Sequence, residues 1–331
     1  MSENISYPVG GIDYPRNLQE FDEWFSSEDA CIKYLLKLRW PNGFKCPVCH
    51  GDKAWMMGRG VLWCVTCRRQ TSPIAGTIFE GTRKPLRLWF QAMWYITSQK
   101  FGGNALGLQR VLGLGSYQTA WSWLHKMRHA MVRPGRNRLS GNVEVDETLV
   151  GGESHGGKRG RGAERKTIVV IAIEIFFPKG FGRVRMRRIE DASGSSLAPF
   201  VCDSIEPGSI VHTDGWRGYN SLTKHGYTHI KKNISESGDP AHVVMPGVHR
   251  ISALLKRWLL STHQGAVSDD HLDCYLDEYT FRFNRRKSKA RGMLFYRLLQ
   301  QAVEIGPVPY KKIINKKNAL FKNLLQQERS G

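Results

Sequence analysis

Four cysteines stand in two closely spaced pairs, an arrangement that can bind a tetrahedral metal ion. Cys46 and Cys49 form the first pair, and Cys64 and Cys67 form the second after fourteen intervening residues. Each Cys-x-x-Cys turn lets both sulfurs reach one ion at about 2.3 Å, and a hairpin between the pairs closes the site. The pattern predicts one structural Zn²⁺ ion. Because such a module has little core of its own, we expect the metal to supply much of its stability.

A second group of polar residues, spread along the chain, has the chemistry of a divalent-cation site. In VEVDET, Glu144 and Asp146 alternate with valines, so a strand here would turn both acids to one face and the valines to a core. In IVHTDG, Asp214 ends a second strand-like run before a glycine. Carboxylates that hold two Mg²⁺ or Mn²⁺ ions are typical of enzymes that cut and join phosphodiesters. The order of the strand-like runs, with an acid on the first and another at the end of the fourth, resembles that of the ribonuclease H-like fold, in which two aspartates on adjacent central strands hold metal between them. That likeness leads us to expect Asp146 and Asp214 to be metal ligands.

His249 is the candidate for a third ligand. It lies 35 positions after Asp214, and Lys256 follows seven positions later, so two helical turns separate the imidazole and the amine on one helix face. A neutral imidazole can take the third place, although it suits Mn²⁺ better than Mg²⁺. Lys256 and Arg257 would hold a backbone phosphate. The other candidates for the third ligand are Glu236, Asp239 and Glu278, and for Glu278 an ion pair with Arg282 is the plainer role.

The elements that must position these residues change in character along the chain, and together they predict a multidomain α/β protein. Residues 1–40 form a small helical element in which Ser26 or Ser27 can cap a helix. The cysteine pairs lie among short β-like segments in residues 41–82, and a helical block rich in Trp and Leu fills residues 83–133. We expect a mixed-sheet domain over residues 141–300 and a basic tail over residues 301–331. The domain has strand-like runs at 142–151, 167–177, 182–190 and 209–215, a helix over 193–205 and a long helix from Val248.

Residues 104–131 predict two helices around the turn GLGSY, with Ser116 as the N-cap of the second. Helix pairs of this kind are common, and the pattern alone favours an ordinary structural pair. The basic charge and the cysteine pairs nearby favour a helix-turn-helix that reads the major groove of DNA. Arg68 and Arg69, just past the second cysteine pair, are further candidates for phosphate contacts, with simple solvation as the alternative. The exposed residues of the second helix would include Tyr117, Gln118, Thr119, Ser122, Lys126 and Arg128.

The charge balance favours a polyanionic partner. The chain has 49 Lys and Arg residues against 29 Asp and Glu, a net charge of +20. Residues 1–30 hold seven acids and one base, so the remaining residues carry a charge of +26. A surplus of this size is typical of proteins that bind nucleic acid, because each neutralised phosphate releases condensed counterions. No apolar run approaches the roughly 18–20 residues of a membrane span and the N-terminus has no signal peptide, so we expect a cytoplasmic, nucleoid-associated protein that binds no membrane.

The chain resembles the insertion-sequence transposases that pair an N-terminal zinc ribbon with an ISXO-like DDE domain. The resemblance implies a ribonuclease H-like catalytic domain with two catalytic metal ions, and a transposase that binds terminal inverted repeats and performs strand cleavage and strand transfer. Its partners would be double-stranded DNA, at transposon ends and target, and further copies of itself in a dimer or larger complex. The matching stretches span about residues 20–295 in family order: ACIKYLLKLRWPNGFKCPVCH, WCVTCRRQTSPIAGTIFEGTRKPL, LQRVLGLGSYQTAWSWLHKMRHAM, VEVDETLVGG, VHTDGWRGYNSL and LLKRWLLSTHQGAVSDDHLDCYLDEYTFRFNRR.

Carried over by position, the family's catalytic residues fall on four places in this chain. The first two aspartates are Asp146 and Asp214, the third position is His249, and the following lysine is Lys256. Family members have Glu, Asn or His at the third position. A histidine here therefore differs from the Asp-Asp-Glu set that gives the DDE domain its name, but it does not imply an inactive enzyme. Which divalent metal the site prefers is not decided by this residue.

Two other functions remain open at this stage. A DNA-binding regulator would keep the zinc ribbon and the helices after losing its chemistry, although the intact Asp146, Asp214 and Lys256 argue against it. A structure-specific nuclease, such as a junction resolvase, would recognise branched DNA without regard to sequence and would join no ends.

Overall fold

The computed structural model describes residues 7–133, 135–151, 166–178, 180–232, 238–265 and 267–314. The chain divides into two compact units, the first made of residues 1–133 and 287–331 and the second of residues 134–286. The expected domain boundary at residue 300 lies beyond this division. The reason is α11 (Arg291–Glu304), which packs with α2 (Glu28–Arg39) and α3 (Leu86–Ser98) of the first unit. None of the described helices is long and apolar enough to cross a membrane.

An aromatic core holds the helices of the first unit together. Phe25 is 1 % exposed, and its ring centroid lies 5.0 Å from that of Phe90 on α3 and 5.8 Å from that of Phe295 on α11. Such rings bury a large apolar area, and their tilted and edge-on contacts add further attraction. Because Phe295 follows the second unit in the chain, segments from both sides of that unit build this core. The other helices are α1 (Leu18–Trp24), α4 (Ala105–Leu112), α5 (Tyr117–Ala130) and α12 (Tyr310–Ile314).

Side-chain caps fix where several of these helices begin, as the sequence predicts. The Ser27 hydroxyl accepts a hydrogen bond from the Ala30 amide at 3.2 Å at the start of α2. The Ser116 hydroxyl accepts one from the Thr119 amide at 3.1 Å at the start of α5. Gly113, with φ of 60°, ends α4 in the left-handed conformation that glycine adopts at low cost. The expected helix-turn-helix is therefore present, with α4 and α5 joined by residues 113–116.

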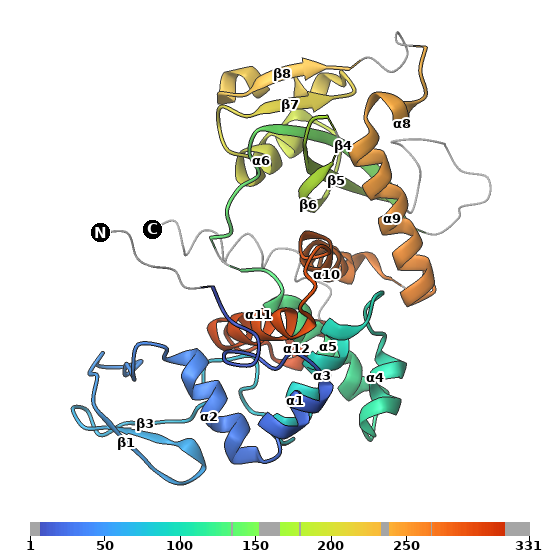
Figure 1. Cartoon of the computed structure of the whole chain (residues 1–331). Helices are drawn as coiled ribbons and strands as arrows, with labels where there is room; N and C mark the ends of the chain where they lie inside the picture. Colours follow the sequence, from blue (N-terminus) through green and yellow to red (C-terminus); the bar gives the residue numbers. More distant parts are fainter. Residues whose placement is uncertain are drawn as a thin grey trace. The chain divides into compact units, whose positions relative to one another are not determined.

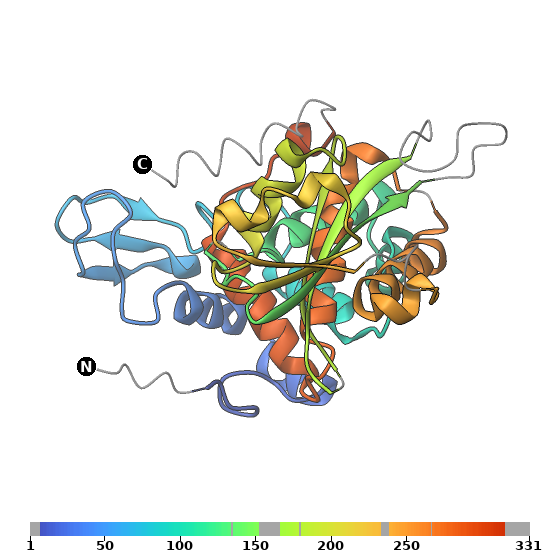
Figure 2. The same cartoon turned by 90° about the horizontal axis from the view of Figure 1, so that it is seen from above.

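A small antiparallel sheet of the first unit lies between and beside the cysteine pairs, with Cys46 and Cys49 before its first strand and Cys64 at the end of its second. Its strands are β1 (Ala54–Met56), β2 (Leu62–Cys64) and β3 (Gln70–Thr71), in that spatial order, with the 3-10 turn η1 (Gly58–Gly60) between the first two. Figure 2 shows this sheet at the left, in blue. The short β-like segments predicted around the cysteines are confirmed.

A five-stranded mixed sheet forms the centre of the second unit (Figure 1). Its order is β6-β5-β4-β7-β8, with β4 antiparallel to β5, β5 antiparallel to β6, and β4, β7 and β8 parallel. The first three strands, β4, β5 and β6, form an antiparallel meander, and β7 and β8 add to the free side of β4. This topology is that of the ribonuclease H-like fold. The four predicted runs form the first four strands, and the short polar β8 was not predicted. The strands are β4 (Asn142–Val150), β5 (Thr167–Ile175), β6 (Phe181–Ile189), β7 (Ile210–Thr213) and β8 (Thr228–Lys231).

Helices cover both faces of this sheet (Figure 1). On one face, Val143 and Val145 of β4 pack with Phe200 of α6, and all three are at most 1 % exposed. On the other face, Ile171 and Ile173 of β5 pack with α9 and α10. The expected helices over 193–205 and from Val248 are confirmed, the second beginning two residues early. The unit contains α6 (Gly194–Ser204), α8 (Ala241–Val244), α9 (Pro246–His263) and α10 (Leu272–Asn284), with 3-10 turns η2 (Arg217–Tyr219), η3 (Leu222–His225) and η4 (Asp269–His271).

Candidate active site and zinc site

The four cysteines converge as the zinc pattern predicts. The Sγ atoms of Cys46 and Cys67 lie 3.6 Å apart, and those of Cys49 and Cys64 lie 3.5 Å apart. Four sulfurs at about 2.3 Å from one tetrahedral ion lie about 3.8 Å from one another, so this cluster fits Zn²⁺. Within the part of the chain that the structure describes, only these cysteines bring three or more potential Cys, His, Asp or Glu ligand atoms within 4.8 Å of one another.

Backbone amides favour the thiolate form at Cys46 and Cys64, whereas hydrogen bonds with the neighbouring sulfurs raise the pKa of Cys49. The amides of Cys49 and Val48 hydrogen-bond the Cys46 sulfur and lower its pKa to about 6. The Cys67 amide likewise lowers the pKa of Cys64. His50 and Arg68, each four residues after the first cysteine of its pair, have φ of 59° and 60°, which turns the chain back at both knuckles.

The sheet brings the segments that carry Asp146 and Asp214 next to each other. Strands β4 and β7 are parallel neighbours whose last paired residues are Glu144 and His212. Asp146 and Asp214 each lie two residues beyond that pair, and Asp214 directly follows the end of β7 at Thr213. One oxygen of each carboxylate is held by the local backbone. Asp146 Oδ1 accepts from the Glu147 amide at 2.8 Å, and Asp214 Oδ1 accepts from the Trp216 amide at 2.9 Å.

His249, in the first turns of α9, lies against this pair of acids. Its Nε2 is 3.9 Å from Oδ2 of Asp146, and its side chain is 32 % exposed. Burial lowers the pKa of His249, while the charges of Glu144 and Asp214 act in the opposite direction. A neutral imidazole at neutral pH keeps a lone pair for a cation. Thus His249 lies beside Asp146, and the charge of Asp214 also acts on its imidazole. Among the described residues, the ligand atoms of these three do not gather within 4.8 Å of one another as the four sulfurs do.

Lys256 extends this polar group along α9. It follows His249 by two turns of the same helix, and its charge contributes to the lowered pKa of His249. Between them, the Ser252 hydroxyl lies 2.7 Å from the Thr148 hydroxyl of β4. Lys256 and the neighbouring Arg257 are both exposed. The group therefore consists of two carboxylates on or just after the interior strands β4 and β7 and an imidazole on α9, followed along α9 by exposed cations.

Two family models match this chain where these sites lie. Residues 138–284 match the model described as ISXO2-like transposase domain, and residues 26–70 match that of the transposase zinc-ribbon domain. The chain belongs to the ISXO2-like insertion-sequence transposases. The first match has nearly the bounds of the second compact unit, residues 134–286.

Two relatives of this chain are also described by reference to transposition. The chain is 28 % identical over 276 residues to an uncharacterised protein in transposable element ISH50 from Halobacterium salinarum, a match that covers 78 % of this chain and 91 % of the relative. It is 25 % identical over 112 residues to an uncharacterised transposase-like protein from Haemophilus influenzae, which covers 34 % of this chain and 89 % of the relative.

The alternative third ligands of the transposase lie in other settings. Glu278 is fully buried on α10, and its Oε1 accepts from Nε of Arg282 at 2.9 Å, so the ion pair expected from their spacing is present. Asp239 is an exposed residue before α8. Glu236 lies outside the described residues. The identity of the third ligand stays a prediction.

Tyr219 is a residue near the acids that the sequence did not single out. The ring is fully buried, and burial together with the charges of Glu147, Asp146 and Asp214 raises its pKa well above the usual value. The phenol therefore stays protonated, and its ring belongs to the core that contains Val143 and Val145 of β4. Tyr219 lies five residues after Asp214, in WRGY, but its burial could not be predicted from that position without the fold.

The predicted DNA-contacting residues of the transposase differ in accessibility. Arg68 and Arg69 are exposed on the ribbon, and Tyr117 and Gln118 are exposed in the first turn of α5, where Gln118 donates to the Tyr310 hydroxyl. Thr119, Ser122 and Lys126 are half-buried, and burial lowers the pKa of Lys126. The expectation that Arg128 is exposed is wrong, because it is 1 % exposed on the side of α5 that also buries Leu124 and Met127.

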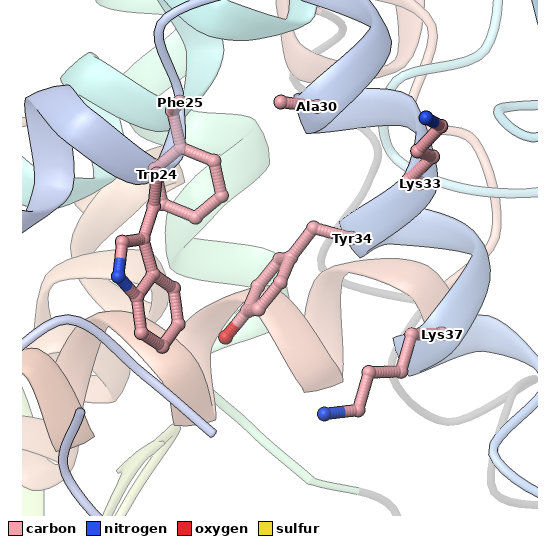
Figure 3. Close-up of a pocket in the computed structure, with 6 residues that line it drawn as sticks. All are labelled: Trp24, Phe25, Ala30, Lys33, Tyr34 and Lys37. Atoms are coloured by element: carbon pink, nitrogen blue, oxygen red, sulfur yellow. The ribbon is translucent and has the colours of Figure 1, made fainter. Parts of the chain in front are cut away.

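A pocket of the first unit lies away from all of these residues (Figure 3). Tyr34, on one wall, donates a hydrogen bond of 2.5 Å to the backbone oxygen of Asp13, and Lys37, on the rim, lies 3.6 Å from the Asp13 carboxylate. None of the predicted site residues lines this pocket. Its lining consists of Trp24, Phe25, Ala30, Lys33, Tyr34 and Lys37.

Proposed function

We propose that this transposase binds the terminal inverted repeats of its element and performs strand cleavage and strand transfer at the site formed by Asp146, Asp214 and His249. The observation that carries the proposal is the convergence of these residues. The two aspartates each lie two residues beyond the last pair of the parallel strands β4 and β7, and the imidazole from α9 lies 3.9 Å from Asp146.

The donor set of this site fits two Mg²⁺ or Mn²⁺ ions. Carboxylate oxygens are the ligands that both ions prefer, and the added imidazole favours Mn²⁺. Asp146 and Asp214 would hold the ions between them, and His249 would ligate one. When bound, the ions would activate the attacking water or 3′-hydroxyl and stabilise the leaving oxygen.

The chain's own residues orient the DNA strand around the site. Backbone amides fix one oxygen of each aspartate, which leaves the carboxylate planes set before a substrate arrives. Lys256, seven residues after His249, would hold a phosphate next to the scissile bond, and Arg257 would hold a second. Such preset charges favour a reaction in which negative charge develops on the transferred phosphate.

DNA recognition would come from the first unit. The exposed first turn of α5, with Tyr117 and Gln118, has the residue types that read base edges from a helix N-terminus. Arg68 and Arg69 on the ribbon would contact the backbone, which adds affinity without sequence preference. Cutting two ends in one event further requires that two or more copies act together.

The test is the separate replacement of the two aspartates. Asp146→Asn and Asp214→Asn keep the side-chain shape and remove the charge, so strand transfer should fall by about 1,000-fold or more. Binding to end DNA should remain, as a gel-shift assay with labelled repeats would show. If either variant joined ends at the parent rate, the assignment of the site would be wrong.

The same assay separates the other two functions. A regulator without chemistry would bind the repeats and nick nothing in Mg²⁺ or Mn²⁺. A structure-specific nuclease would cut a branched DNA of unrelated sequence and produce no joined product. A transposase requires its own repeats and joins them to a target.

A further inference from the structure

The helix that carries His249 cannot cap its own beginning. The residue before α9 is Met245, which has no oxygen in its side chain and makes no side-chain cap hydrogen bond. The first amides of any helix lack partners within the helix and need an acceptor from elsewhere. At the start of α9 these amides are buried, so water does not provide it.

Glu144 of β4 supplies that acceptor from more than a hundred residues away. Its Oε2 accepts from the Gly247 amide at 2.7 Å and from the Val248 amide at 3.1 Å, and the side chain is 1 % exposed. A negative charge at a helix N-terminus is also stabilised by the helix dipole. The carboxylate thus takes the place of an N-cap residue.

Lys232 completes the arrangement at the other carboxylate oxygen. Its Nζ lies 3.6 Å from Oε1 of Glu144 and donates to the backbone oxygen of Val244 at 3.1 Å. A buried carboxylate is costly unless it is paired and hydrogen-bonded. Here the amides of α9 and the Lys232 ammonium together compensate the charge of Glu144. The same ammonium donates to the last residue of α8.

These contacts set the register of α9 on β4. Glu144, Asp146 and Thr148 alternate along β4 and share one face. Along that face, Glu144 binds the amides of residues 247 and 248, Asp146 faces His249, and Thr148 meets Ser252 at 2.7 Å. The helix is therefore held to the strand on both sides of the Asp146–His249 pair.

Gly247 shows how closely the helix approaches the strand. A Cβ atom added there would lie 2.7 Å from Oε2 of Glu144 and 3.0 Å from Cγ2 of Ile173. Atoms at such distances must move apart. Any side chain at this position would push the start of α9, and with it His249, away from the acids.

We propose that Glu144, with Lys232, is a positioning residue that fixes the start of α9 and thereby sets His249 against Asp146. Glu144 is not itself a ligand of the catalytic cations, because both of its oxygens face α9 and Lys232. The proposal rests on the function proposed for Asp146, Asp214 and His249, and it adds residues that act through the backbone of the helix.

The first unit provides a matched control. There the residue before α3 is Pro85, which has no side-chain cap either, and Glu28 accepts from the amides of Leu86 and Arg87 at 2.7 and 3.2 Å. Glu28→Ala therefore removes the same kind of cap from a helix that carries none of the proposed metal ligands. Its effect on stability provides the reference for a purely structural loss.

The experiment measures Mn²⁺ binding to the full zinc-loaded chain and amide exchange at the two helix starts. In Glu144→Ala, exchange at residues 247 and 248 should quicken and Mn²⁺ affinity should fall by about 10- to 100-fold, the size typical for groups that orient metal ligands. Glu144→Gln keeps an oxygen acceptor and should recover most of that affinity. Glu28→Ala should quicken exchange at residues 86 and 87 and leave Mn²⁺ affinity at the parent value.

Several outcomes decide the matter. Parent-like Mn²⁺ affinity in Glu144→Ala, with faster exchange at residues 247 and 248, would overturn the proposal. An equal loss in Glu144→Gln and Glu144→Ala with unchanged exchange would also overturn it, because the carboxylate would then act on the metal directly. Should Glu144→Ala fail to fold, Glu144→Gln and Gly247→Ala carry the test, and Gly247→Ala should lower Mn²⁺ affinity while zinc content stays at the parent level.

A separate pair of variants distinguishes this inference from the function on which it rests. Asp146→Asn and His249→Ala should each lower Mn²⁺ affinity. If they do not, the proposed function has failed. If they do and Glu144→Ala does not, only the role of Glu144 has failed.

Discussion

The zinc site and the carboxylate site assemble their ligands in different ways. The four cysteines lie within residues 46–67, whereas Asp146, Asp214 and His249 are spread over residues 146–249 and come from strand β4, the turn after β7 and helix α9. The cysteine site needs the ion to hold a small sheet together. The residues of the carboxylate site belong to a buried sheet with helices on both faces, so we expect this sheet to fold without the catalytic ions. One metal would thus belong to the fold and the other to the reaction.

The largest expected effect tests this difference directly. Cys49→Ser, or removal of zinc by a chelator, should abolish amide protection in β1, β2 and β3, since structural zinc contributes about 10–16 kcal/mol in comparable modules. Protection in the strands of the second unit should not change. Transfer of the zinc-loaded protein to buffer without Mg²⁺ or Mn²⁺ should leave both sheets protected. Persistent protection of β1–β3 without zinc would remove the contrast.

A second effect concerns the buried acid that is not part of the proposed site. Arg282→Ala leaves the fully buried Glu278 without the guanidinium 2.9 Å away, and loss of one partner of a buried pair costs about 3–5 kcal/mol of unfolding free energy. The double variant Glu278→Gln, Arg282→Met should recover much of that loss. Denaturant unfolding measures both, and Mn²⁺ affinity should stay unchanged. A fall in Mn²⁺ affinity at equal folding would restore Glu278 as a candidate ligand.

A third effect sharpens the choice of metal at the carboxylate site. His249→Glu replaces a nitrogen donor by oxygen, so the ratio of cleavage rates in Mg²⁺ and Mn²⁺ should shift toward Mg²⁺ by about tenfold or more. His249→Ala serves as the control and should lower both rates. The measurement is single-turnover cleavage of end DNA in each metal. An unchanged ratio in His249→Glu would show that His249 does not ligate the ion.

The smallest effect lies on the ribbon. Arg68→Ala removes one predicted phosphate contact, which should weaken DNA binding by about 1 kcal/mol and reduce the slope of log affinity against log salt by about 1. Lys33→Ala, in the pocket of the first unit, is the control and should change neither quantity. Binding titrations at several salt concentrations give both values. An unaltered slope would assign Arg68 to ordinary solvation.

The features that sequence predicts well here are those whose cause is local. The cysteine spacing, the Ser27 and Ser116 caps and the alternation around Asp146 all depend on neighbours within a few residues, and the structure contains each of them. The prediction that Asp146 and Asp214 act together needed one further step, the strand order, and the structure contains the parallel neighbours β4 and β7 on which it depends.

The features that were missed depend on contacts between distant residues. Nothing near Glu144 in the sequence indicates that its carboxylate accepts hydrogen bonds from the first amides of α9. The burial of Arg128 likewise depends on how α5 packs against other helices. Strand β8 escaped prediction because THIK is short and mostly exposed and so lacks the alternation that marks a half-buried strand. Helix α11 has a helical sequence pattern, but that pattern does not show which unit the helix belongs to. It belongs to the first unit because Phe295 packs against Phe25 there.

The division of the first unit between the two ends of the chain has a consequence for its synthesis. Phe295 reaches the aromatic core only after residues 134–286 have been made, because the second unit interrupts the first. A chain still on the ribosome at residue 286 therefore holds a complete ribonuclease H-like sheet and an incomplete first unit. The part proposed to recognise DNA would mature last, so that nascent fragments would carry the catalytic acids before they could select a place to use them.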